Sequence, residues 1–260
     1  MGAAGEICIG TVLLEVNRWA RREAKRPSFA VSDWTGRFRQ AGFDGMELWQ
    51  FHATRCAPGE VERLAAAGFP TRIFNIYPTM TAAERAELAD CSRLAVRLGA
   101  AGIKFNVGPE PGRRSEYRDE LRRWRAELPA GVMPLCECHP GTILEEPEAA
   151  RRFFDELGGE GWGIIVHPFS RFESLAEWLR FFGPAVRHAH LQMRGAEDRI
   201  IGFAERPDLA REAVGMMRAA GYRGSWALEF TAGTARPGEN IEALWRAALE
   251  DLAFLRGLLG

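Results

Sequence analysis

The sequence predicts a single-domain (β/α)8 barrel that takes in residues 1–260. Eight short segments, apolar or alternating in polarity, are each followed by a stretch with helical periodicity, and strands that alternate with helices form parallel sheets. A chain of 260 residues also has the length that eight strands and eight helices need. No linker or low-complexity tract divides the sequence, so we expect no second domain.

Glycines mark the ends of four expected helices. Ala41-Gly42-Phe43, residues 67–69, Ala101-Gly102-Ile103 and residues 220–222 share the pattern Ala-Gly followed by an apolar residue. Glycine readily adopts the left-handed conformation that closes a helix, and the apolar residue then opens a strand. The eight expected strands are Ile7–Val12, Gly45–Trp49, Thr71–Tyr77, Ile103–Val107, Met133–Cys138, Trp162–His167, Val186–Gln192 and Ser225–Phe230.

Two expected helices carry signals of their own. Thr81-Ala-Ala-Glu84 has the capping-box pattern and predicts a helix that runs toward Leu98. The last helix has one apolar stripe, as a helix covering a sheet should. A doubly wound open sheet is the alternative fold, but no G-x-G-x-x-G turn follows the first strand. The apolar stripe consists of Ile241, Leu244, Trp245, Ala248, Leu252 and Leu255.

Composition narrows the class of protein. The 34 basic and 35 acidic residues give a formal net charge of -1, which argues against a general nucleic-acid binder. The five cysteines are odd in number and scattered, and Cys136 and Cys138 are expected to be apolar core residues. No secretory leader or apolar run of about 20 residues is visible. We expect a cytoplasmic protein without a membrane or nucleic-acid partner. The sequence leaves open whether it forms a homo-oligomer.

Polar side chains gather near the carboxyl ends of the last four expected strands, where a (β/α)8 barrel builds its active site. Alternation along a strand places Glu137 and His139 on one face with Leu135. The same alternation puts two histidines and a glutamine on one side of the seventh strand. The polar residues near these four ends are Glu137, His139, His167, His188, His190, Gln192 and Glu229.

Four of these residues are candidate metal ligands. Glu137, His167, His190 and Glu229 belong to consecutive strands, and carboxylates and imidazoles both bind divalent transition metals. The alternative is an ion-paired cluster that only holds the barrel mouth together. The sequence favours the metal site, because all four strands end in the same way.

Other expected strands add polar groups at the same level. Glu47 and Trp49 share a face of the second strand, Asn75 and Tyr77 a face of the third, and Lys104 and Asn106 a face of the fourth. Only two of the 34 basic residues are lysines, Lys25 and Lys104. Lys104 is either an ammonium with an adjustable pKa or a buried counter-ion to Glu137. Lys25 is expected in an exposed basic segment.

With these motifs the sequence resembles the xylose isomerase-like TIM-barrel family, which includes sugar isomerases and epimerases, inosose dehydratase and the endonuclease IV type of repair enzymes. Gly42-Phe-Asp-Gly-Met-Glu47 resembles the second-strand motif of that family. Glu137-Cys-His139 resembles its fifth-strand Glu-Asn-His segment. His188-Ala-His190-Leu-Gln and Leu228-Glu229-Phe resemble the segments that carry its seventh-strand and eighth-strand ligands.

The resemblance implies a metal-dependent isomerase or epimerase that acts on a small polyhydroxylated carbonyl compound through an enediolate. Glu137 and Glu229 would be both ligands and the acid and base pair, with His139 and Lys104 as further catalytic candidates. The expected ligands are Glu137, His167, His190 and Glu229. The expected substrate-binding residues are Glu47, Trp49, Asn75, Asn106, His188 and Arg194.

Two departures from the family pattern affect the expected site. The sixth strand reads His167-Pro-Phe-Ser170 where the family has Asp-x-x-His, and Met193 stands where an aspartate is common. A site with two imidazoles favours Zn, Mn, Co or Ni over Mg. A dehydratase of a cyclic polyol ketone and a barrel that only binds a sugar stay open, and the substrate, phosphorylated or not, is undetermined.

Overall fold

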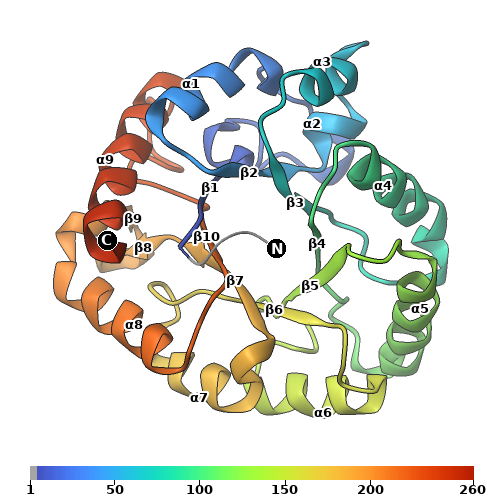
Figure 1. The fold of residues 1–260 in the computed structure, drawn as a ribbon. Helices are drawn as coiled ribbons and strands as arrows, with labels where there is room; N and C mark the ends of the chain where they lie inside the picture. Colours follow the sequence, from blue (N-terminus) through green and yellow to red (C-terminus); the bar gives the residue numbers. More distant parts are fainter. Residues whose placement is uncertain (1–4) are drawn as a thin grey trace.

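A computed structural model describes residues 5–260 as a closed barrel of parallel strands inside a ring of helices (Figure 1). The strands follow one another around the barrel in the order β1-β10-β7-β6-β5-β4-β3-β2. This confirms the predicted (β/α)8 fold; the first four residues of the predicted domain lie outside the described part. The barrel strands are β1 (Ile7–Gly10), β2 (Gly45–Trp49), β3 (Thr71–Asn75), β4 (Gly102–Phe105), β5 (Met133–Glu137), β6 (Gly163–Val166), β7 (Val186–Leu191) and β10 (Ser225–Leu228).

All eight predicted strands form, and seven of them end one or two residues before the predicted position. The chain leaves the barrel at these points to begin its loops. His167 and Glu229 therefore each follow directly after a strand, β6 and β10, and their side chains lie at the carboxyl-end mouth.

Helices follow every barrel strand, and β2 is followed by two of them (Figure 1). Gly42 has a left-handed φ of 93°, as predicted. Gly102 was expected to close a helix in the same way, which is wrong: it opens β4, and Gly99, with a φ of 67°, follows α4 instead. The helices are α1 (Thr35–Ala41), α2 (Phe51–Thr54), α3 (Glu60–Ala66), α4 (Arg85–Arg97), α5 (Arg114–Glu127), α6 (Pro147–Leu157), α7 (Phe172–Phe182), α8 (Pro207–Ala219) and α9 (Ile241–Leu259).

Two local features differ from the expected pattern. Thr81 precedes a 3-10 turn, Ala82–Glu84, and its hydroxyl bonds the Glu84 carboxylate at 2.9 Å instead of capping a backbone N–H. The loop after β7 contains a small antiparallel sheet of β8 (Met193–Arg194) and β9 (Ile200–Ile201). This sheet positions Arg194 at the barrel mouth.

Alternation along β5 separates the barrel interior from the helix layer. Leu135 packs with Ile73 and Ile165 inside the barrel, and Gly163 leaves room for it, because a Cβ there would lie 2.4 Å from Leu135 Cδ2. Cys136 belongs to the core under the helices, as predicted. Glu137, two residues beyond Leu135, therefore points inward at the carboxyl end.

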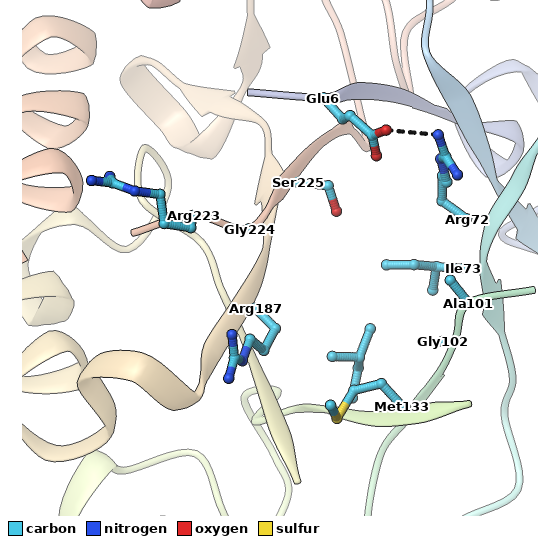
Figure 2. Close-up of a pocket in the computed structure, with 11 residues that line it drawn as sticks. Glu6, Arg72, Ile73, Ala101, Gly102, Met133, Arg187, Arg223, Gly224 and Ser225 are labelled. Atoms are coloured by element: carbon cyan, nitrogen blue, oxygen red, sulfur yellow. Dashed lines mark hydrogen bonds and ion pairs between the residues drawn. The ribbon is translucent and has the colours of Figure 1, made fainter. Parts of the chain in front are cut away.

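Between the strands at the amino end of the barrel lies a narrow cavity of about 30 Å³, room for little more than a water molecule. Figure 2 shows the Glu6 carboxylate paired with Arg72 at the edge of this cavity, and the two charged groups lie 2.6 Å apart. Ser225 and Arg187 also line this cavity. Within residues 5–260, no helix is both long and apolar enough to cross a membrane.

Candidate metal centre

Two carboxylates and two imidazoles converge at the carboxyl-end mouth of the barrel. His167 Nε2 lies 3.0 Å from Glu137 Oε1, and His190 Nδ1 lies 3.2 Å from the same oxygen. Glu229 Oε1 lies 3.5 Å from His190 Nδ1. One ligand atom from each of these four residues falls within 4.8 Å of the others.

This arrangement fits a divalent metal ion. A four-coordinate cation bound at about 2.0 to 2.2 Å holds its ligand atoms roughly 3 to 4 Å apart, which is the spacing observed between the imidazole and carboxylate atoms. Two nitrogen and two oxygen donors are a ligand set typical of zinc and similar transition metals. Glu137, His167, His190 and Glu229 are thus the residues that would hold the ion.

A third carboxylate, Glu47, lies directly beneath this cluster. Its Oε2 is 2.9 Å from His190 Nε2 and 3.0 Å from His188 Nε2, and its Oε1 accepts a hydrogen bond from Asn75 at 2.7 Å. The contact to Nε2 leaves His190 Nδ1 facing Glu137 and Glu229. A carboxylate that bonds the distal nitrogen in this way fixes the ring orientation and tautomer of a metal-binding histidine.

Burial and charge set the pKa values around Glu47. Burial alone would raise the pKa of its carboxyl, but His190 and His188 hold it well below the usual range. Burial lowers the pKa of His188. For His190 the carboxylates Glu47 and Glu229 outweigh burial and raise the pKa well above its ordinary value. These two carboxylates therefore favour the protonated form of His190.

Lys104 neutralises the other side of Glu137. Its Nζ lies 2.7 Å from Glu137 Oε2 and donates to Asn106 Oδ1 at 2.6 Å. Asn106 in turn donates to the Glu137 backbone carbonyl at 2.7 Å. Burial would raise the pKa of Glu137, but Lys104 above all holds it well below its usual value. Lys104 is thus a buried counter-ion of Glu137, and the catalytic role expected for it stays a prediction.

Glu229 is less enclosed than Glu137. Its side chain is 12% exposed against 4% for Glu137, and its Oε2 accepts a hydrogen bond from Gln192 at 2.9 Å. Gln192 is oriented by Arg194, which donates to it at 3.1 Å and pairs with Asp198 at 2.6 Å. Of the two carboxylates, Glu229 is better placed to meet a substrate.

A cavity of about 570 Å³ opens above the cluster, large enough for a monosaccharide-sized ligand. A second pocket of about 360 Å³, which includes His167 and Ser170, shares three lining residues with it. The shared residues are His139, Gln192 and Arg194. Among the residues that line the larger cavity are Asn75, Tyr77, Lys104, Asn106, Glu137 and Glu229.

The predicted substrate-binding residues divide into two groups. Asn75, Asn106 and Arg194 line the larger cavity. Glu47, His188 and Trp49 do not line either pocket at this end and are almost completely buried. We expected these three residues to contact the substrate directly, but they lie too deep to do so. Side-chain alternation predicted the correct face of each strand, but it did not predict how far below the mouth each side chain lies.

His139 lies at the exposed rim of the cavity. Its Nδ1 lies 2.7 Å from the neighbouring backbone carbonyl of Pro140. The catalytic role expected for it stays a prediction.

The segment between β1 and α1 contributes cavity residues that the sequence did not predict. Arg18, Trp19 and Lys25 line the larger cavity, and Lys25 is half-buried, so the expectation of an exposed segment was wrong for this residue. The buried Glu15 holds this segment: it accepts hydrogen bonds from the Ser28 and Asn17 backbone at 2.8 Å and contacts His52. The scarcity of lysine was the only signal that could have pointed to Lys25.

No protein-family model and no curated protein sequence matches this chain. Solved structures match it over nearly its whole length. D-psicose 3-epimerase in the presence of D-fructose is 18% identical with a TM-score of 0.70, covering 98% of this chain and 99% of that one. The probable 3-DHS dehydratase AsbF from Bacillus anthracis is 15% identical with a TM-score of 0.69, covering 95% and 98%.

A third similar structure is a xylose isomerase-like TIM barrel protein from Mycobacterium smegmatis in complex with magnesium. It is 14% identical to this chain with a TM-score of 0.64, and the match covers 100% of both chains. At these identities the likeness shows the fold. The chain therefore has the fold of the xylose isomerase-like barrels, as its motifs predicted.

Proposed function

We propose that this protein is a metal-dependent isomerase or epimerase of a small polyhydroxylated carbonyl compound. The observation that carries the proposal is the convergence of Glu137, His167, His190 and Glu229 beneath a sugar-sized cavity. The likeness in fold to D-psicose 3-epimerase supports the substrate class. The nitrogen and oxygen donor set favours Zn, Mn, Co or Ni over Mg.

The residues around the cluster have different roles in the proposed reaction. A bound cation would supply the positive charge that stabilises an enediolate. Glu229, the more accessible carboxylate, removes the proton from the carbon next to the carbonyl, and its hydrogen bond from Gln192 fixes the oxygen that receives it. Glu137 is the second carboxylate of the acid and base pair, and the proton that it returns to the substrate comes from the Lys104 ammonium, which lies 2.7 Å from its Oε2.

Polar groups of the cavity wall position the substrate. Asn75 is held by Glu47, and within residues 5–260 its Oδ1 has no hydrogen-bond partner, so it offers an acceptor to a substrate hydroxyl. Tyr77 and Phe230 supply apolar surface for the carbon skeleton. The cavity thus offers polar groups for the hydroxyl and carbonyl oxygens and aromatic walls for the carbon skeleton.

A dehydratase is the second candidate, favoured by the likeness in fold to the probable dehydratase AsbF. The same proton removal would be followed by expulsion of hydroxide from the neighbouring carbon, so that the product loses one water. The third possibility, a barrel that binds a sugar without turnover, would bind ketoses and exchange no proton.

Deuterium exchange tests the proposal. Protein reconstituted with Mn, Co, Zn, Ni or Mg is incubated with ketohexoses and inososes in D2O, and deuterium at the carbon next to the carbonyl is followed by NMR. We expect exchange that depends on the metal and falls at least about 100-fold in Glu229→Gln. The exposed Glu250→Gln serves as the matched control.

The outcomes separate the candidates. A product lighter by one water identifies the dehydratase. Metal-dependent binding of a ketose without deuterium exchange identifies a barrel that binds a sugar without turnover. A protein that binds no metal, or a Glu229→Gln variant that exchanges as fast as wild type, contradicts the proposal.

A further inference from the structure

Among the described residues that line the larger cavity, Lys25 is a cation that the proposed chemistry does not use and that has no carboxylate partner. Four cationic side chains line it, those of Arg18, Lys25, Lys104 and Arg194, against two carboxylates. Three of the four have a carboxylate partner: Lys104 pairs with Glu137, Arg194 with Asp198, and Arg18 with a glutamate of the loop before α9. Within residues 5–260, no acidic side chain forms an ion pair with Lys25.

The contacts of Lys25 hold its ammonium group in place without neutralising it. Nζ donates to the Arg18 backbone carbonyl and lies 5.6 Å from the centre of the Trp49 ring and 5.5 Å from that of Tyr77. These are the distances of a cation held against aromatic faces. Burial and the nearby charges of Arg55 and Arg18 lower the pKa of Lys25, so an anion beside it would stabilise its charged form.

Lys25 is connected to the candidate metal centre through Tyr77. Lys104 Nζ lies 5.3 Å from the centre of the same Tyr77 ring, and Lys104 contacts Glu137. The only two lysines of the chain therefore approach one aromatic ring in one cavity, although 79 positions separate them in the sequence. A ligand whose carbonyl end lies at Glu137 and Glu229 can reach Lys25 with its other end.

We propose that Lys25 forms an anion subsite, and that the substrate is a sugar-like carbonyl compound with a carboxylate or phosphate group that pairs with its ammonium. This inference rests on the proposed function, since it describes the distal end of the same ligand. Both groups are oxygen anions that accept charge-assisted hydrogen bonds from an ammonium. The experiment distinguishes the two sources.

Matched ligands test the subsite. Binding of D-fructose, D-fructose 6-phosphate and 5-keto-D-gluconate to the metal-loaded protein is measured by calorimetry. We expect an anionic ketose to bind about tenfold or more tightly than D-fructose, a difference typical of a hydrogen bond to a charged group. Preference for the phosphate ester or for the carboxylate identifies the anion.

Three variants assign the effect to Lys25. Lys25→Met keeps the aliphatic stem and should reduce the anionic advantage to less than about twofold, whereas Lys25→Arg should retain it. Arg21→Met removes one charge from an exposed neighbour that does not line the cavity and should change nothing. Unfolding temperature and metal content, measured for every variant, verify that the fold and the metal centre are intact.

The outcomes are separable from those of the proposed function. Equal affinity for neutral and anionic ketoses, or an anionic advantage that survives Lys25→Met, overturns the subsite and leaves the isomerase proposal standing. If no ketose binds, the isomerase proposal fails, and inorganic phosphate becomes the probe of the subsite. Weaker phosphate binding in Lys25→Met than in Arg21→Met then supports the subsite, and equal binding overturns it.

Discussion

The two ends of the barrel both carry charged side chains, but those at the carboxyl end line a much larger cavity. At the amino end, Arg72 and Glu6 form an ion pair whose side chains are 31% and 12% exposed, beside a cavity of about 30 Å³. At the carboxyl end, Lys104 and Glu137 are 5% and 4% exposed and line a cavity of about 570 Å³. The charged side chains of the candidate site differ from those of the amino end because they are buried, converge on one another and line a large cavity. Charge alone does not distinguish the two ends, since both carry charged side chains.

The largest expected difference between the two ends concerns stability. Lys104→Met leaves the carboxylate of Glu137 buried without its main counter-ion and should lower the free energy of unfolding by about 3 to 5 kcal/mol. Arg72→Met at the amino end should cost less, about 1 kcal/mol, because this pair is only half-buried and water partly screens it. Urea unfolding of both variants measures the two values. Equal losses would mean that the carboxyl-end pair is no more isolated from water than the other.

Metal affinity provides the second comparison. Glu47→Gln removes the carboxylate that contacts His190 and His188 and should weaken metal binding by about 10-fold to 100-fold without removing a ligand. Glu6→Gln is the matched change at the amino end and should leave the affinity unchanged. Competition titrations with a chromophoric chelator give both constants. An unaltered affinity in Glu47→Gln would show that the His190 ring is oriented by other contacts.

The third expected effect concerns Asp251, a buried carboxylate of α9 outside both ends. Burial raises its pKa from 3.8 to about 6, although hydrogen bonds from Thr231 and the Phe203 backbone oppose the shift. The folded state therefore binds the proton more tightly than the unfolded state. The resulting stabilisation is complete below about pH 4 and is lost as the pH rises through about 6.

A pH series on Asp251→Asn isolates this contribution. The difference in unfolding free energy between wild type and variant should change by at most about 1.4 kcal/mol per pH unit between pH 4 and 6, and stay constant above pH 7. A flat difference across the whole range would contradict the raised pKa.

Individual residues show how far sequence reasoning reaches into this molecule. Glu137 and His190 are placed at the carboxyl-end mouth by strand order and side-chain alternation, both of which are local patterns. Glu47 obeys the same alternation, yet it lies beneath the cluster instead of in the cavity, because depth depends on how neighbouring strands are staggered. The β8 and β9 sheet and its Arg194 depend on pairing between residues in an irregular loop.

The barrel, its eight strands and the polar residues at four strand ends could be predicted from the amino-acid order, because periodicity and glycine positions are local patterns of the chain. Three contacts emerged only from the folded molecule: Glu47 supports His190, Lys104 neutralises Glu137, and Lys25 enters the cavity. These contacts join residues far apart in the sequence. Their formation depends on strand stagger and on the buried Glu15 that folds its loop over the mouth, and no local pattern encodes either.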